Sequence, residues 1–135
     1  MWRKIPLLLI CGIFLFGQQP INELPQSTST YALTAYDLAA TAATNIKGSG
    51  GNVWAWYGYN PNATVCYLQF YNSTSAVLGT SALHSFGIPA GAAFNISPGP
   101  IALFNLATGI STGQTTTATG SSQCASAMVI TILYD

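Results

Sequence analysis

The sequence predicts an all-β protein: a single antiparallel β-sandwich, jelly-roll-like, with about eight strands. Two observations lead to this fold class. After residue 41, short runs rich in Val, Ile, Tyr, Phe and Trp recur about every 8–12 residues, and clusters of Gly, Pro, Asn and Ser separate them. Beyond residue 45, no stretch is long and periodic enough for a long helix, which excludes parallel βαβ units.

The expected strands follow one another between these turn signals. In chain order they are 52–59, 64–71, 76–78, 82–88, 92–96, 101–106, 114–118 and 125–134. The last run alternates clearly and places Met128, Ile130, Ile132 and Tyr134 on one face. Because this face is the more apolar one, we expect it to line the core.

The run 52–59 has two alternatives for its buried face. Trp54 and Trp56 share one face, whereas Val53, Tyr57 and Tyr59 share the other. An odd number of residues in the following turn aligns the Trp pair with the core, and an even number places it on the opposite side. We favour the core, because the burial of two Trp side chains is worth several kcal/mol at about 25 cal/mol per Å².

The chain is expected to have three parts. Residues 1–17 form a signal peptide or an N-terminal anchor, because positive residues precede an apolar run shorter than the ~20 residues of a membrane span. Residues 18–40 form an extended arm or linker, although the Ala-rich stretch 31–43 could form one helix. Residues 41–135 form the β-sandwich domain.

Beyond the leader the chain carries almost no charge. The charged residues there are Glu23, Asp37, Lys47 and Asp135. Without a basic patch, binding to nucleic acid lacks its main source of free energy, so we expect no nucleic-acid partner. Weak charge repulsion instead favours self-assembly into a homo-oligomer or polymer. Surface glycans are a second class of partner, and a membrane is expected only through the leader, if the leader is retained.

Two cysteines, Cys66 and Cys124, remain once Cys11 is assigned to the leader. An even pair in an exported protein predicts one disulfide. Cys66 shares a face with Leu68 and Phe70, and Cys124 is in phase with the apolar face of the last strand, so the bond would join two core-facing positions. No cluster of His or carboxylate residues lies near the pair, so we expect neither a metal nor another cofactor.

Catalytic residue types are too sparse for an active site. His84 is the single histidine, and Ser81 and Ser85 are the nearby hydroxyls. A nucleophile needs a base that a third group orients, and adjacent residues in a strand, such as His84 and Ser85, face opposite sides. We therefore expect a protein that is not an enzyme.

A Tyr-rich strip is the strongest binding signal. The candidate interaction face comprises Tyr57, Tyr59, Tyr67 and Tyr71. Tyr side chains are favoured both at protein interfaces and where sugars stack. Asn62 and Asn72 begin N-x-S/T patterns in turns, which makes them candidate glycosylation sites in a host that modifies secreted proteins.

The arm is a further candidate contact. Its Thr and Tyr residues suit an extended strand, and the chain has few charges to protect an open sheet edge. Residues 18–40 could therefore add a strand to a neighbouring subunit. The same arm could instead fold back on its own domain or tether that domain to a membrane.

Four segments together resemble a family of small β-sandwich proteins that recur in phage and prophage-like genomes. They are 51–60 (GNVWAWYGYN), 65–72 (VCYLQFYN), 87–91 (GIPAG) and 128–134 (MVITILY). The resemblance covers roughly residues 41–135 and implies association with a virion, but it carries over no functional residues. The hydrophobic leader and the arm depart from the family pattern and point towards export.

The function that we expect is that of a structural or decorative subunit of an extracellular assembly, either a virion or a cell-surface filament, acting by contact between subunits. The expected location is secreted, on an extracellular surface or in a virion. The alternative is a secreted carbohydrate-binding module that uses an exposed Trp/Tyr face. An inhibitor-like or toxin-like secreted domain is a third reading, which the residues neither support nor exclude.

Overall fold

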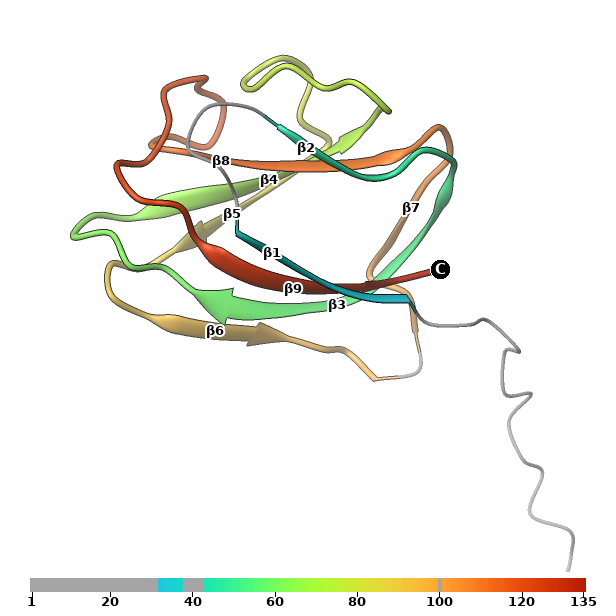
Figure 1. The fold of residues 1–135 in the computed structure, drawn as a ribbon, viewed down its shortest axis with the longest axis horizontal. Helices are drawn as coiled ribbons and strands as arrows, with labels where there is room; N and C mark the ends of the chain where they lie inside the picture. Colours follow the sequence, from blue (N-terminus) through green and yellow to red (C-terminus); the bar gives the residue numbers. More distant parts are fainter. Residues whose placement is uncertain (1–31, 38–42, 100) are drawn as a thin grey trace, which may run out of the picture.

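A computed structural model of the protein describes residues 32–37, 43–99 and 101–135, with side chains from residue 43 onwards. This part of the chain contains nine β-strands and no helix (Figure 1). The strands are β1 (Ala32–Asp37), β2 (Thr44–Lys47), β3 (Gly51–Tyr59), β4 (Cys66–Asn72), β5 (His84–Ile88), β6 (Ala93–Ile96), β7 (Phe104–Leu106), β8 (Ile110–Thr115) and β9 (Val129–Tyr134).

The strands form two antiparallel sheets with jelly-roll topology. Sheet A has the order β1-β9-β3-β6, with the short β7 also paired to β3, and sheet B has the order β2-β8-β4-β5. In a jelly roll, one long antiparallel hairpin is rolled up so that its strand pairs alternate between two sheets. The hairpin pairs here are β1·β9, β2·β8, β3·β6 and β4·β5, and the rolling brings β9 beside β3 and β8 beside β4. The predicted fold class is therefore confirmed, with β7 as an addition to the eight strands of the roll.

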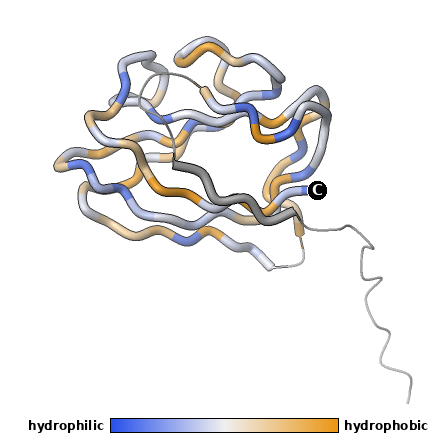
Figure 2. Tube along the Cα trace, in the orientation of Figure 1, coloured by the Kyte–Doolittle hydropathy of each residue, from blue (hydrophilic) through white to orange (hydrophobic). Residues whose placement is uncertain are grey.

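The core lies between the two sheets. Apolar stretches recur along the strands (Figure 2), and the apolar positions of both inner faces are buried. Met128, Ile130 and Ile132 have no exposed surface, which confirms the predicted core face of the last strand. Trp56 packs against Phe70 and Phe86, with ring centroids 5.1 and 4.6 Å apart. These rings join the inner faces of sheets A and B.

A β-bulge in β3 separates the two tryptophans that the sequence places on one face. In the pairing of β3 with β9, Val53 lies opposite Tyr134 and Ala55 opposite Leu133, so Trp54 is the additional residue. One extra residue reverses the alternation beyond it. The prediction was therefore right for Trp56, which is fully buried, and wrong for Trp54, which does not share its face.

Several predicted elements need correction. The stretch 76–78 lies in a loop, and the strand expected at 114–118 is β8, which ends at Thr115. Within 31–43 the structure describes residues 32–37, which form a strand, and residue 43, which lies in no helix or strand. β1 lies within the predicted arm 18–40 and pairs with β9 of the same chain, so the sandwich begins at or before Ala32 rather than at 41. The alternative in which the arm folds back on its own domain thus holds for this segment.

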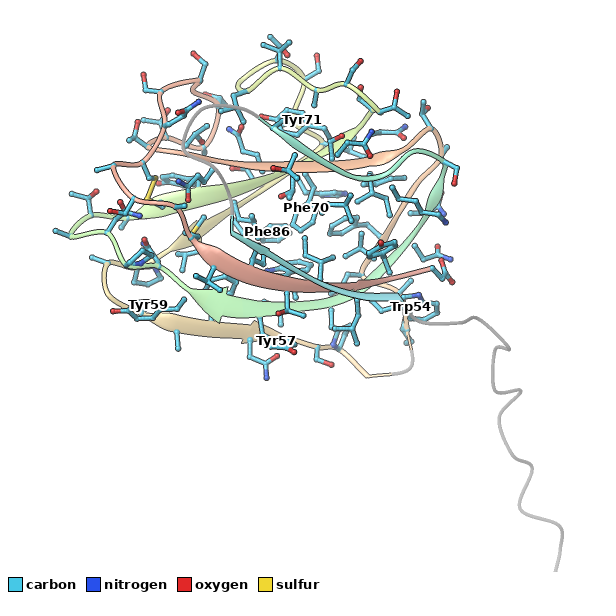
Figure 3. The ribbon with its side chains drawn as sticks, viewed as in Figure 1. Trp54, Tyr57, Tyr59, Phe70, Tyr71 and Phe86 are labelled. Atoms are coloured by element: carbon cyan, nitrogen blue, oxygen red, sulfur yellow. A yellow bond between two sulfur atoms is a disulfide. The ribbon has the colours of Figure 1, made fainter. Side chains whose placement is uncertain are left out.

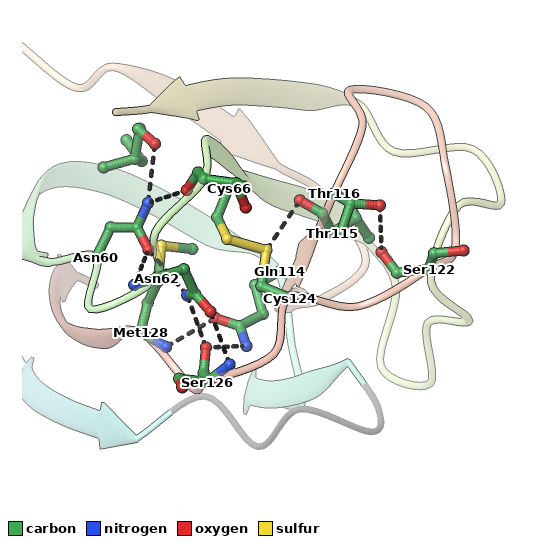
Figure 4. Close-up of a disulfide and its surroundings, with 12 residues drawn as sticks. Asn60, Asn62, Cys66, Gln114, Thr115, Thr116, Ser122, Cys124, Ser126 and Met128 are labelled. Atoms are coloured by element: carbon green, nitrogen blue, oxygen red, sulfur yellow. Dashed lines mark hydrogen bonds between the residues drawn. A yellow bond between two sulfur atoms is a disulfide. The ribbon is translucent and has the colours of Figure 1, made fainter. Parts of the chain in front are cut away.

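The predicted disulfide between Cys66 and Cys124 is present (Figure 4). It links the first residue of β4 to the loop before β9, across a sequence separation of 58 residues. Both cysteines are buried in the core, as the alternation predicted. The bond therefore joins the long 116–128 connection to sheet B.

The predicted leader 1–17 and the arm residues 18–31 lie outside the described residues. In the described part of the chain, no helix is long and apolar enough to cross a membrane.

Candidate interaction surface

The outer face of sheet A presents two tyrosines to solvent. Tyr57 and Tyr59 are 43 % and 46 % exposed, and in Figure 3 both point away from the core below β3. Residues i and i+2 of a strand lie about 7 Å apart on one face. The two phenol rings therefore form a short row along the strand.

The strands on either side of β3 extend this row into a wider surface. Register places Asn95 of β6 and Thr131 of β9 on either side of Tyr57, and Ala93 and Val129 on either side of Tyr59. Val129 is 54 % exposed, which is high for an aliphatic side chain in a strand. We call these residues the outer tyrosine face: Tyr57, Tyr59, Ala93, Asn95, Val129 and Thr131.

Two backbone features of β3 hold this surface in place. The bulge at Trp54 sets the alternation that turns Tyr57 and Tyr59 outwards. Between them, Gly58 faces the core, where an added Cβ would lie 2.0 Å from the carbonyl oxygen of Val129 and 3.0 Å from the ring of Phe94. The absence of a side chain at Gly58 thus allows β6 and β9 to approach β3 closely beneath the tyrosine row.

The other two tyrosines of the predicted strip belong to a different surface. Tyr67 and Tyr71 lie on β4 in sheet B, so the four residues do not form one face, and this prediction was wrong. Tyr71 is buried beneath loops 73–83 and 116–123. The strip divides because β3 and β4, although consecutive, belong to opposite sheets of the roll.

Tyr71 is the centre of a hydrogen-bonded support for those two loops. Its hydroxyl donates to Oε1 of Gln69 and accepts the N–H of Gly79 at 3.0 Å. Nε2 of Gln69 in turn donates to the carbonyl oxygens of Ala118, at 2.9 Å, and Gly120, at 3.3 Å. Burial raises the pKa of the Tyr71 hydroxyl, and the hydrogen bond from Gly79 partly opposes this shift.

The two candidate glycosylation sites differ in access. Asn62 is 5 % exposed, and its Nδ2 donates to Asn60 Oδ1 and to the carbonyl oxygen of Ser126. A glycan on that nitrogen is incompatible with this packing, so the proposal fails for Asn62 in the folded protein. Asn72 is exposed and accepts the N–H of Thr108 through Oδ1, which leaves its Nδ2 on the surface.

His84 packs on aromatic residues at the edge of the core. Its ring stacks on Phe104, with centroids 4.3 Å apart, and Ser85 points to the opposite face of β5, as the alternation predicted. Among the described residues, no group of three or more His, Cys, Asp or Glu side chains is placed to hold a metal ion.

No protein-family model, curated protein or solved structure matches the chain. A jelly roll supports many functions, so we infer function from the exposed surface.

Proposed function

We propose that this protein is a non-enzymatic structural subunit of an extracellular assembly, a virion or a cell-surface filament, and that the outer tyrosine face is its contact with a second copy of the chain. The observation that carries the proposal is the exposure of Tyr57, Tyr59 and Val129 together on one sheet face. Tyr is enriched at protein interfaces, because its ring contributes area and its hydroxyl accepts or donates a hydrogen bond.

A second copy is the occupant that this surface suits best. None of the six residues of the outer tyrosine face is charged, and the nearest charged position in the register of sheet A is Asp37 of β1, opposite Val129 at the edge of this face. A two-fold contact requires a surface that is complementary to itself, and rows of Tyr flanked by Asn95 and Thr131 can pair hydrogen-bond donors with acceptors in either direction. Sheets pack face to face at about 10 Å, which leaves room for interdigitated side chains.

The composition and the disulfide agree with this function. A nearly uncharged protein has little electrostatic barrier to association, and an internal disulfide suits an oxidising environment.

The experiment compares two double variants by sedimentation velocity. Y57S/Y59S removes the rings from the outer tyrosine face, and V65S/I101S removes two exposed apolar side chains elsewhere, which are 44 % and 70 % exposed. We expect the first variant to dissociate and the second to retain the wild-type mass. If Y57S/Y59S assembles like the wild type while it remains folded, the proposed contact is wrong.

Carbohydrate binding is the second candidate for the same surface. Two adjacent Tyr rings beside the amide of Asn95 combine a stacking surface with a hydrogen-bonding group. Pull-down on immobilised glycans with the same variants separates the two functions: loss of glycan binding in Y57S/Y59S at unchanged mass would favour the sugar module.

A further inference from the structure

The loop 73–83 lines an open hollow on the sheet B side of the molecule. Its volume is about 410 Å³, within the ~300–1,000 Å³ range of small-molecule sites. The residues that line it are all uncharged: Tyr71, Asn72, Ser73, Ser75, Ala76, Val77, Thr80, Ser81 and Leu83. In Figure 3 Tyr71 lies at the opposite side of the sandwich from Tyr57, so the hollow and the outer tyrosine face do not overlap.

Residues of sheet B anchor the loop that forms the hollow. The N–H of Gly79 donates to the Tyr71 hydroxyl at 3.0 Å, and Leu78 is 5 % exposed. Leu78 fills the space above Gly113, where an added Cβ would lie 2.2 Å from Leu78 Cδ2. Gly79 also lies against Gly120, since an added Cβ there would come within 2.7 Å of the Gly120 carbonyl carbon. These contacts hold the walls of the hollow in one shape before any ligand arrives.

Ser81 adds an independent sign of a functional position. Its φ is +56°, and it is the single non-glycine residue with a positive φ in the described part of the chain. Gly or Asn adopts this backbone conformation at lower cost than Ser. A strained residue that lines a hollow indicates that its side chain contributes something the cheaper residues do not.

Several polar atoms that line the hollow make no hydrogen bond within the described part of the chain and could bind the hydroxyl groups of a ligand. Oδ1 of Asn72 is taken by the N–H of Thr108, so its two Nδ2 hydrogens remain available. Within the described part of the chain, the hydroxyls of Ser75 and Ser81 make no hydrogen bond. Val77 and Leu83 are 67 % and 54 % exposed and offer apolar surface beside these groups.

We propose that this hollow binds a neutral saccharide unit. Donors and acceptors without charge match the hydroxyls of a sugar, and the apolar side chains match its C–H faces. The lining residues offer no cation to an anionic ligand such as a nucleotide. In an assembly held through sheet A, the hollow on sheet B would remain open to solvent, and the subunit would act as an adhesive surface.

The test uses the exported protein made in bacteria without glycosylation, because a glycan on Asn72 would fill the hollow. Backbone amide NMR spectra are recorded with glucose, galactose, mannose, N-acetylglucosamine and their common disaccharides as probes. We expect at least one sugar to shift amides within 71–83. If no sugar in the panel shifts them, the proposal is wrong, and shifts confined to Tyr57 and Tyr59 would instead assign sugar binding to the outer tyrosine face.

Variants then separate binding from stability. N72D keeps an Oδ acceptor for the N–H of Thr108 and removes the two Nδ2 hydrogens, so it should weaken the Kd at least roughly 3- to 10-fold, as the loss of one neutral hydrogen bond does, while the protein remains folded. S81G should weaken the Kd to a similar extent and raise the Tm, because it removes the hydroxyl and relieves the backbone together. S97A is the matched control and should change neither. An S81G protein that binds as tightly as the wild type would overturn the role of the Ser81 hydroxyl.

Discussion

Asn62 and Ser126 hold each other by two hydrogen bonds in opposite directions (Figure 4). Nδ2 of Asn62 donates to the carbonyl oxygen of Ser126 at 2.8 Å, and the N–H of Ser126 donates to Asn62 Oδ1 at 2.7 Å. The same Nδ2 donates to Asn60 Oδ1 at 2.9 Å. This pair links the turn after β3 to the loop that carries Cys124, so the side chain serves the fold and not a glycan.

The first prediction concerns this pair. N62A leaves the N–H of Ser126 without its partner and removes one of the two hydrogen bonds that Asn60 Oδ1 accepts, so it should lower the free energy of unfolding by about 1–3 kcal/mol. S97A changes an exposed hydroxyl outside the outer tyrosine face and should stay within about 0.5 kcal/mol of the wild type. Urea denaturation measures both. Equal stabilities for the two variants would show that the Asn62–Ser126 pair contributes little.

The second prediction concerns the disulfide. Closure of a loop with a sequence separation of 58 constrains the unfolded chain, and removal of the bond in C66A/C124A should cost about 4 kcal/mol. Alkylation of the exported protein without reductant, followed by mass spectrometry, should label neither cysteine. Two labelled cysteines in native protein would contradict the bond.

Sequence reasoning succeeded where local pattern decides the structure. The alternation along residues 128–134 places Ile130 and Ile132 together on the core face of β9, and both are buried. The even number of cysteines beyond the leader predicts the disulfide. The strand β8 was misplaced because its residues, Ile110–Thr115, are mostly polar and yet all buried. Their burial comes from both sides: Ile110 belongs to the core, whereas Ser111 and Gly113 lie under the loop 73–83, a long-range cover that periodicity does not report.

Only part of the outer tyrosine face could be predicted from the sequence, because the other part depends on pairing between strands distant in the chain. The aromatic residues of β3 and β4 mark both strands in the sequence, and Tyr57 and Tyr59 do form an exposed row. The residues that complete the outer tyrosine face, Val129 and Asn95, come from strands that pair with β3 only through long-range register. The bulge at Trp54 leaves no local signal, so the faces of β3 could not be assigned from the sequence.

The third prediction concerns Gly58. A methyl group there would lie 2.0 Å from the Val129 carbonyl oxygen, so β9 must move away from β3 to admit it. G58A should therefore lower the Tm strongly, at a cost of about 2–4 kcal/mol. G48A is the control, because an added Cβ at Gly48 meets nothing within 4 Å. Thermal denaturation that ranks the two variants alike would refute the close approach of these strands.

The fourth prediction concerns alkaline pH. Burial raises the pKa of Tyr71 above that of the unfolded chain, about 10, so the folded state favours the neutral phenol. This contribution is complete below pH ~10 and is lost as the pH rises through the folded-state pKa. Y71F should be less stable than the wild type at neutral pH, by about 1–3 kcal/mol, because Gln69 and Gly79 lose a partner.

Denaturation at about pH 8 and about pH 11 checks this prediction, because the two values lie on either side of the pKa of about 10 that the Tyr71 phenol has in the unfolded chain. The stability of the wild type should fall between them, and Y71F should show a smaller fall. Y57F, altered at an exposed tyrosine, should follow the wild type. A fall in Y71F as large as in the wild type would exclude Tyr71 as its source.

The most direct measurement of the central claim is the native mass of the exported wild-type protein, determined by light scattering over a range of concentrations. If the outer tyrosine face joins copies of the chain, the mass should exceed that of one chain and rise with concentration towards a defined multiple or a polymer. A protein that keeps the mass of a single chain at every concentration would contradict the assembly function.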